Sequence, residues 1–191
     1  MCLCGLAATT MLLTSCGGNP SGDRKPSGRG GQGANATQAK APNFALSAVP
    51  AGAKDVADIK TSAKRGDEVV MRGIVGGRPK PFLDEVAVVT VVDVNFVGPC
   101  DPDGHCSIPW DYCCSDKTAI TAAMATVQVV DTDGKPLPGT LRGVGGLEPL
   151  ATVTVRGTVA DVERGKRLVI NAAAAHVQPY KPTKVPDAPS R

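Results

Sequence analysis

The sequence of 191 residues contains few aromatic residues, few histidines and no long apolar segment. Phe, Trp and Tyr make up 3% of the chain, and there are two histidines. It has no Gly-rich phosphate loop, no nucleophile elbow and no cysteine pair with C-x-x-C spacing. The chain therefore lacks the sequence signatures by which P-loop enzymes, α/β hydrolases and zinc ribbons are usually identified. We therefore expect a protein that is not an enzyme and has no cofactor.

A basic domain is also absent, although the chain as a whole has a formal charge of +3. Between Ala45 and Gln178 there are fourteen Lys and Arg against sixteen Asp and Glu, so this part of the chain carries a net charge of −2. The basic excess lies in the residues before and after it. A domain of this charge is not typical of a general nucleic-acid-binding protein.

The strongly apolar segment at the N-terminus, Cys2 to Ser15, has a length suited to a signal peptide. At about fourteen residues it is shorter than the roughly 20 that cross a bilayer as a helix. It ends in Leu13-Thr14-Ser15-Cys16, followed by two glycines, and has no Lys or Arg before it. This motif resembles the bacterial lipobox. The resemblance implies a signal peptide over residues 1–15, lipid attached to Cys16, and an anchor in a bacterial cell-envelope membrane, facing the periplasm or the exterior.

Two segments have the composition of flexible tails. Residues 16–44 contain mainly Gly, Pro, Ser, Asn, Gln and charged residues, and offer little apolar surface to offset the entropy lost on ordering. Residues 179–191 are similar and shorter. We therefore predict a disordered tether over 16–44, a domain over 45–178 and a flexible tail over 179–191.

The domain is predicted to be all-β, because Val-rich and alternating segments are separated by Gly, Pro and Asp turns. No segment keeps a 3.6-residue apolar period for long. Residues 48–64 are expected to add a short helix or strand in front, and residues 118–124 form either a short helix or an extension of a strand. The predicted strands are residues 68–75, 86–94, 125–130, 152–159 and 168–177.

Three strands, an irregular crossover and a closing hairpin form an element order similar to that of the OB-fold. The similarity is clearest from Arg156 to Val177, where V-R-G-T-V, a charged turn and L-V-I-N-A resemble the last two strands of that family. It implies a small five-stranded barrel in which Gly73 and Gly157 allow sharp bends. An eight-stranded barrel or a small sandwich would share most of these signals.

The most distinctive segment is G-P-C-D-P-D-G-H-C-S-I-P-W-D-Y-C-C, from Gly98 to Cys114. It would be an insertion between the second and third strands. Four clustered cysteines after an export signal predict two disulfides that hold a loop lacking a core of its own. Because a bridge between adjacent cysteines is strained, we expect Cys100 and Cys106 each to pair with Cys113 or Cys114.

Two other hypotheses apply to the same segment. The four cysteines, with His105 in reserve, could bind Zn²⁺ or Cu(I), although the spacing C-x5-C-x6-C-C lacks the short paired knuckles of zinc ribbons. The adjacent cysteines could also form a thiol-redox pair, which would need a thiol of low pKa.

The OB resemblance implies that ligands bind at the loops between strands one and two and between strands four and five. Those loops carry Arg78 and Lys80, and Arg164 and Lys166. Two basic loops on one side of an acidic domain would attract an anionic ligand. Trp110 and Tyr112 in the cysteine segment could add a stacking surface for a base or a sugar ring.

Three functional hypotheses follow from these features. The first is a membrane-tethered, exported and non-catalytic binding module, whose partners are membrane lipid through Cys16 and an unknown protein or anionic polymer. The second is an OB-type binder of single-stranded nucleic acid or another anionic polymer, for which nucleic acid is the less expected ligand because little of it is met outside the cell. The third is a metal-binding or thiol-redox protein of the envelope that uses the Cys100–Cys114 loop.

Overall fold

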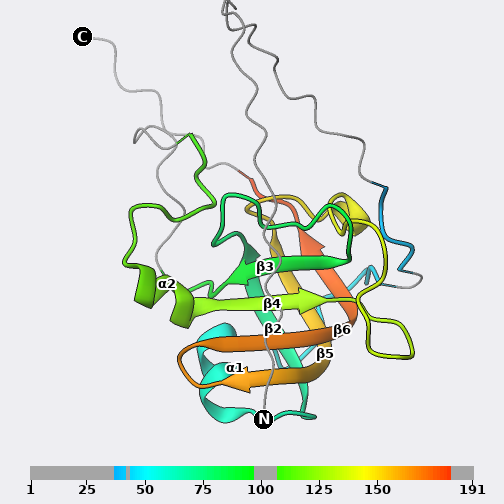
Figure 1. Ribbon diagram of the computed structural model, residues 1–191, viewed down its shortest axis with the longest axis horizontal. Coiled ribbons are helices and arrows are strands. Elements are labelled where there is room, and N and C mark those ends of the chain that lie inside the picture. Colours follow the sequence, from blue (N-terminus) through cyan, green and yellow to red (C-terminus); the bar gives the residue numbers. More distant parts are fainter. Residues whose placement is uncertain (1–36, 42–43, 97–106, 182–191) are drawn as a thin grey trace, which may run out of the picture. The chain divides into compact units, whose positions relative to one another are not determined.

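A computed structural model describes residues 37–41, 44–96 and 107–181, and these form a mostly β structure with short helices (Figure 1). Helix α1 (Val56–Ser62) and helix α2 (Lys117–Ala123) have seven residues each, and Val144–Gly146 is a 3-10 turn. No helix within the described ranges is long and apolar enough to cross a bilayer. The strands are β1 (Lys54–Asp55), β2 (Glu68–Val75), β3 (Val88–Val92), β4 (Met124–Gln128), β5 (Thr152–Glu163) and β6 (Arg167–Gln178).

Five of the strands pair in a ring. Strand β2 pairs antiparallel with β3 and with β5, and β3 pairs antiparallel with β4. The ring continues through a parallel pairing of β4 with β6 and closes through the long antiparallel hairpin of β5 and β6. The two-residue strand β1 joins the sheet outside this ring, parallel to β2.

The strands form where apolar and β-branched residues alternate with polar ones. In β5, Val153, Val155 and Val159 are buried, whereas Arg156 and Thr158 between them are exposed. Strand β3 is more continuously apolar and is buried along most of its length. The inward-facing side chains form one main hydrophobic cluster, to which the strands of the ring and α1 contribute.

The structure confirms a predominantly β chain and a strand within each of the five predicted segments. The ambiguous segment near residue 120 is a helix. It begins there because the Asp116 carboxylate accepts hydrogen bonds from the backbone N–H groups of Thr118 and Ala119, at 2.9 and 2.8 Å. The long hairpin extends further than predicted, because β5 continues to Glu163 before a tight turn.

The segment in front of β1 packs against the sheet. Ala39 is 6% exposed and Phe44 is 2% exposed, although both belong to the predicted tether. The Ala39 N–H donates to the Thr140 carbonyl at 2.8 Å, and the Leu46 N–H donates to the Ala175 carbonyl at 2.8 Å. Residues 37–46 therefore contribute two apolar side chains to the core from outside the expected domain.

Candidate functional site

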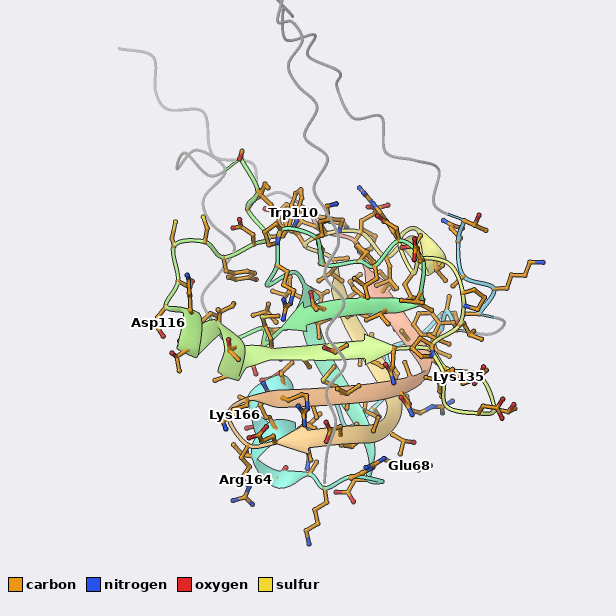
Figure 2. All side chains as sticks on the ribbon, viewed as in Figure 1. Glu68, Trp110, Asp116, Lys135, Arg164 and Lys166 are labelled. Atoms are coloured by element: carbon orange, nitrogen blue, oxygen red, sulfur yellow. The ribbon has the colours of Figure 1, made fainter. Side chains whose placement is uncertain are left out.

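A groove of about 400 Å³ lies beside β4, between α2 and the turn that joins β5 to β6. The loop that follows β2 also contributes to it, through Arg78. Figure 2 shows Lys166 and Arg164 at the β5–β6 turn, on the same side of the view as Asp116 at the start of α2. The groove is lined by Arg78, Thr121, Met124, Ala125, Thr126, Glu163, Lys166, Arg167 and Leu168.

Three of the lining side chains are cationic and one is acidic, which gives the groove a formal charge of +2. Two of the cations are paired: Lys166 Nζ lies 2.8 Å from Glu163 Oε1, and Arg167 pairs with Asp161. The hydrogen bond between Lys166 and Glu163, reinforced by their opposite charges, raises the pKa of Lys166 and lowers the pKa of Glu163. Arg78 has no ion pair within the described part of the chain, so its guanidinium is the cation most available to an anion.

The loop that carries Arg78 is fixed by hydrogen bonds to the segment in front of α2. The Gly77 N–H donates to the Trp110 carbonyl at 2.8 Å, and the Trp110 indole N–H donates to the Pro79 carbonyl at 3.1 Å. A Cβ at Gly76 would lie 2.7 Å from the Trp110 carbonyl oxygen, so only glycine allows this approach. The position of Arg78 therefore depends on the chain around Trp110.

The two aromatic residues predicted as a stacking surface do not line the groove. Tyr112 is 2% exposed, and its ring centroid lies 6.3 Å from that of Phe96. Trp110 is partly buried and holds the Arg78 loop. The structure thus brings together Arg78 and Lys166 of the predicted ligand residues, while Lys80 and Arg164 are exposed outside the groove lining.

A buried lysine that was not predicted from the sequence lies behind the groove. Lys60 is 2% exposed, and its Nζ donates to the Thr121 carbonyl at 3.0 Å and to the Met124 carbonyl at 2.6 Å. Desolvation by burial lowers the pKa of Lys60 to about 8. The one available signal was helical spacing, since Lys60 follows buried Val56 by four residues and so shares its face of α1.

The lowered pKa of Lys60 predicts that the protein becomes more stable as the pH rises from about 8 to about 10.5. In this window the unfolded chain keeps a proton on Lys60 that the folded chain has released, so the free energy of unfolding increases with pH. Below pH 8 the ammonium is charged in both states, and the cost of burying it is fully present. The gain is at most about 3 kcal/mol, because each unit of pKa difference between the folded and unfolded states corresponds to about 1.4 kcal/mol.

Urea unfolding of the wild type and of Lys60→Met at pH 7, 8, 9 and 10 measures this effect. Both proteins share the other groups that titrate in this range, so the difference between them isolates Lys60. Parallel pH dependences in the two proteins would show that Lys60 does not cause the change.

The two described cysteines, Cys113 and Cys114, are exposed, and their Sγ atoms lie 3.8 Å apart. This exceeds the roughly 2.05 Å of a disulfide bond, so the two are not bonded to one another. Cys16, Cys100, His105 and Cys106 lie outside the described residues. Within the described ranges no three His, Cys, Asp or Glu residues gather as a metal site. The disulfide, metal and redox hypotheses for this segment stay predictions.

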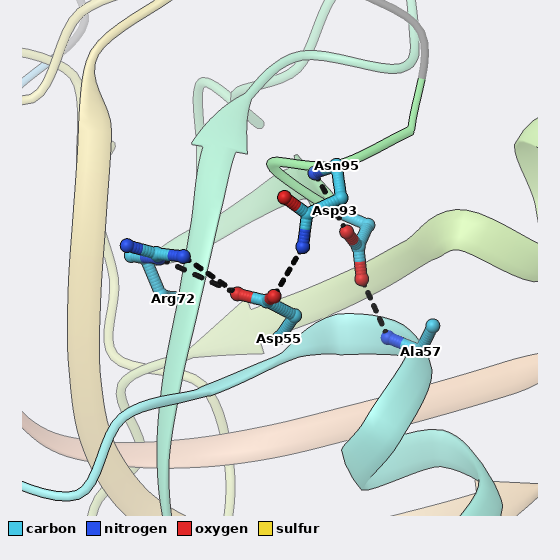
Figure 3. Close-up of polar contacts among 5 residues, drawn as sticks. All are labelled: Asp55, Ala57, Arg72, Asp93 and Asn95. Carbon is cyan, nitrogen blue, oxygen red and sulfur yellow. Dashed lines mark hydrogen bonds and ion pairs between the residues drawn. The ribbon is translucent and has the colours of Figure 1, made fainter.

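A second hollow, of about 300 Å³, lies at the start of α1 and has acidic walls. Figure 3 shows the contacts of two of its carboxylates, which serve the fold. Asp93 accepts from the N–H groups of Ala57 at 2.7 Å and Asn95 at 2.8 Å, so it caps α1 from the end of β3. Asp55 pairs with Arg72 at 3.1 Å and accepts from the Asn95 amide. These contacts account for Asp55 and Asp93 without a ligand.

Comparisons with protein-family models, with curated proteins and with solved structures give no match to the chain. An argument about function therefore depends on the geometry of the groove. That geometry combines a cationic rim, two threonine hydroxyl groups and apolar side chains in one open depression.

Proposed function

We propose that the chain is an OB-like binding module that holds a segment of an extended anionic polymer in the groove beside β4. The observation that carries the proposal is the meeting of Arg78 with Lys166 and Arg167 around one depression, although nearly half of the chain separates them. Cations drawn from two distant loops are the arrangement expected of a site for an anionic ligand.

The strand pairing supports the OB-like part of the proposal. In chain order the strands of the ring are β2, β3, β4, β5 and β6, so the groove lies on the third strand. The loop between the first and second strands and the loop between the fourth and fifth strands lie on either side of it. In the OB-fold these two loops and the adjoining strand face bind oligonucleotides and oligosaccharides. The groove therefore lies where the OB resemblance predicts a ligand.

The lining supports a polymer segment rather than a buried small molecule. The groove is partly open to solvent, and its volume is at the lower end of ordinary ligand pockets. Arg78 supplies a charge that no acidic side chain in the described part of the chain pairs with, and Thr126 on β4 adds a polar residue to the lining. Met124, which is only partly buried, offers apolar surface to the uncharged part of each repeating unit.

The export signal predicted from Cys16 selects among anionic polymers. A module tethered to the envelope would meet acidic polysaccharide far more often than single-stranded nucleic acid. We therefore propose an acidic polysaccharide as the ligand, with nucleic acid as the alternative that a binding assay distinguishes.

Replacing Arg78 and Lys166 together by alanine is expected to weaken binding to a fluorescent heparin oligosaccharide about ten- to a hundredfold. The slope of log affinity against log salt concentration should decrease by about two, because two ionic contacts are lost. Titration by fluorescence anisotropy at several salt concentrations measures both quantities. A single-stranded DNA oligonucleotide of matched charge, titrated in parallel, shows which polymer binds more tightly.

The control is Lys135→Ala with Arg142→Ala, which removes the same charge from positions outside the groove lining. Lys135 lies on the opposite side of the view from Lys166 (Figure 2). Equal losses in the two double variants would mean that only net charge matters, and the groove would then not be the binding site.

A further inference from the structure

The wall of the groove next to α2 is held from behind by Lys60. Thr121 and Met124 line the groove, and their backbone carbonyl groups accept hydrogen bonds from the Lys60 ammonium, at 3.0 and 2.6 Å. These two residues therefore connect the ammonium to the groove. Lys60 is 2% exposed, so water screens its charge poorly.

The Thr121 carbonyl lies in the last turn of α2 and also accepts from the Met124 N–H, whereas the Met124 carbonyl belongs to the first residue of β4. Carbonyl oxygens carry partial negative charge, which would repel an anion at the wall of the groove. The Lys60 ammonium donates to both oxygens and places a positive charge beside them. Without it, the two carbonyl groups would lose this donor and the wall would be more electronegative.

We propose that Lys60 is a positioning residue of the groove, which fixes the wall formed by Thr121 and Met124 and makes that wall favourable to an anion. The inference rests on the proposed function. Besides the cations on the rim of the groove, the site would then include a residue that does not touch the ligand.

The charge of Lys60 is not neutralised by an ion pair with any residue that the structure describes. Asp55 is already paired with Arg72, and Asp93 caps α1. Besides Lys60, the charged residues on α1 and on the elements packed against it are Lys54, Asp55, Asp58, Glu68, Arg72 and Lys117, and Asp116 caps the start of α2.

The first test compares Lys60→Met with Lys64→Met, which removes an exposed lysine four residues further along the chain. Both variants lose one positive charge, and only the first loses the contact with the wall. At pH 7 we expect Lys60→Met to bind the heparin oligosaccharide about five- to tenfold more weakly than Lys64→Met does. Equal affinities would overturn the role of Lys60 while leaving the groove as the ligand site. A wild type that binds no anion would overturn both proposals.

The second test needs only the wild type, and it decides the question if Lys60→Met fails to fold. If the protein binds the ligand more tightly when Lys60 is charged, then binding of the ligand must in turn favour protonation of Lys60. The pKa of Lys60, followed through the ¹³Cε chemical shift, should rise by about half a unit to one unit when heparin oligosaccharide saturates the protein, which corresponds to a three- to tenfold effect on affinity. A purely structural role would leave this pKa unchanged on binding, and that result would overturn the proposal.

Discussion

Gly157→Ala is expected to lower the free energy of unfolding by about 3 kcal/mol or more, because the ring has no space for a side chain at this position. A Cβ on Gly157 would lie 2.2 Å from the Asn171 carbonyl oxygen and 3.0 Å from Ala172 Cα. Both contacts are with backbone atoms, which cannot turn aside as a flexible side chain can. Urea unfolding followed by circular dichroism measures the change, and failure to obtain folded protein would be the extreme form of the same result.

The position matters because the hairpin is irregular there. The pairing of β5 with β6 shifts register between Arg156 and Gly157, so the partner strand comes unusually close. The control is Gly134→Ala in the turn after β4, where a Cβ meets nothing within 4 Å but φ is 79°. The left-handed backbone conformation alone should lower the free energy of unfolding of this control by about 1 to 2 kcal/mol. If Gly157→Ala is no less stable than this control, the close approach of the strands does not limit the fold.

Phe44→Ala is expected to lower the free energy of unfolding by about 3 to 5 kcal/mol, as for other buried phenylalanines. The side chain is 2% exposed and belongs to the main hydrophobic cluster. Its backbone is fixed as well, since the Phe44 carbonyl accepts from the Ala175 N–H at 2.6 Å. Urea unfolding gives the size of the loss, and the midpoint should move with little change in slope.

Val49→Ala provides the matched control a few residues later. Val49 is 52% exposed, so its truncation should change stability by no more than about 0.5 kcal/mol. An equally small effect of Phe44→Ala would mean that residues before Ala45 contribute nothing to the fold, as expected of a tether.

The strands could be predicted from the sequence because their signal is local. Alternation such as that in β5 places every second residue on one face, and this pattern needs no knowledge of the partner strand. Phe44 was missed for the opposite reason. It is the only large apolar residue from Gly17 to Phe44, a segment of turn-forming composition, and its backbone pairs with Ala175, more than a hundred residues away.

The candidate site was predictable in its charges and not in its aromatic residues. Arg78 and Lys166 were found because loops of a recognisable hairpin pattern carried them, and both line the groove. Tyr112 was expected near a ligand, yet its ring is buried. Sequence proximity to the loops could not show on which side of the backbone the ring would pack. Lys60 was missed because a charged residue on a short helix is ordinarily taken to face solvent.

The packed segment in front of β1 also gives the molecule a mechanical property. Within the described chain, tension applied from the N-terminal side would act on the Ala39–Thr140 and Leu46–Ala175 hydrogen bonds and on the buried ring of Phe44 before it reached β1. Ala175 lies seven residues along β6 from Leu168 in the groove, roughly 23 Å at the rise of an extended strand. A pulling force applied in front of Ala39 would therefore act on the sheet at a distance from the groove.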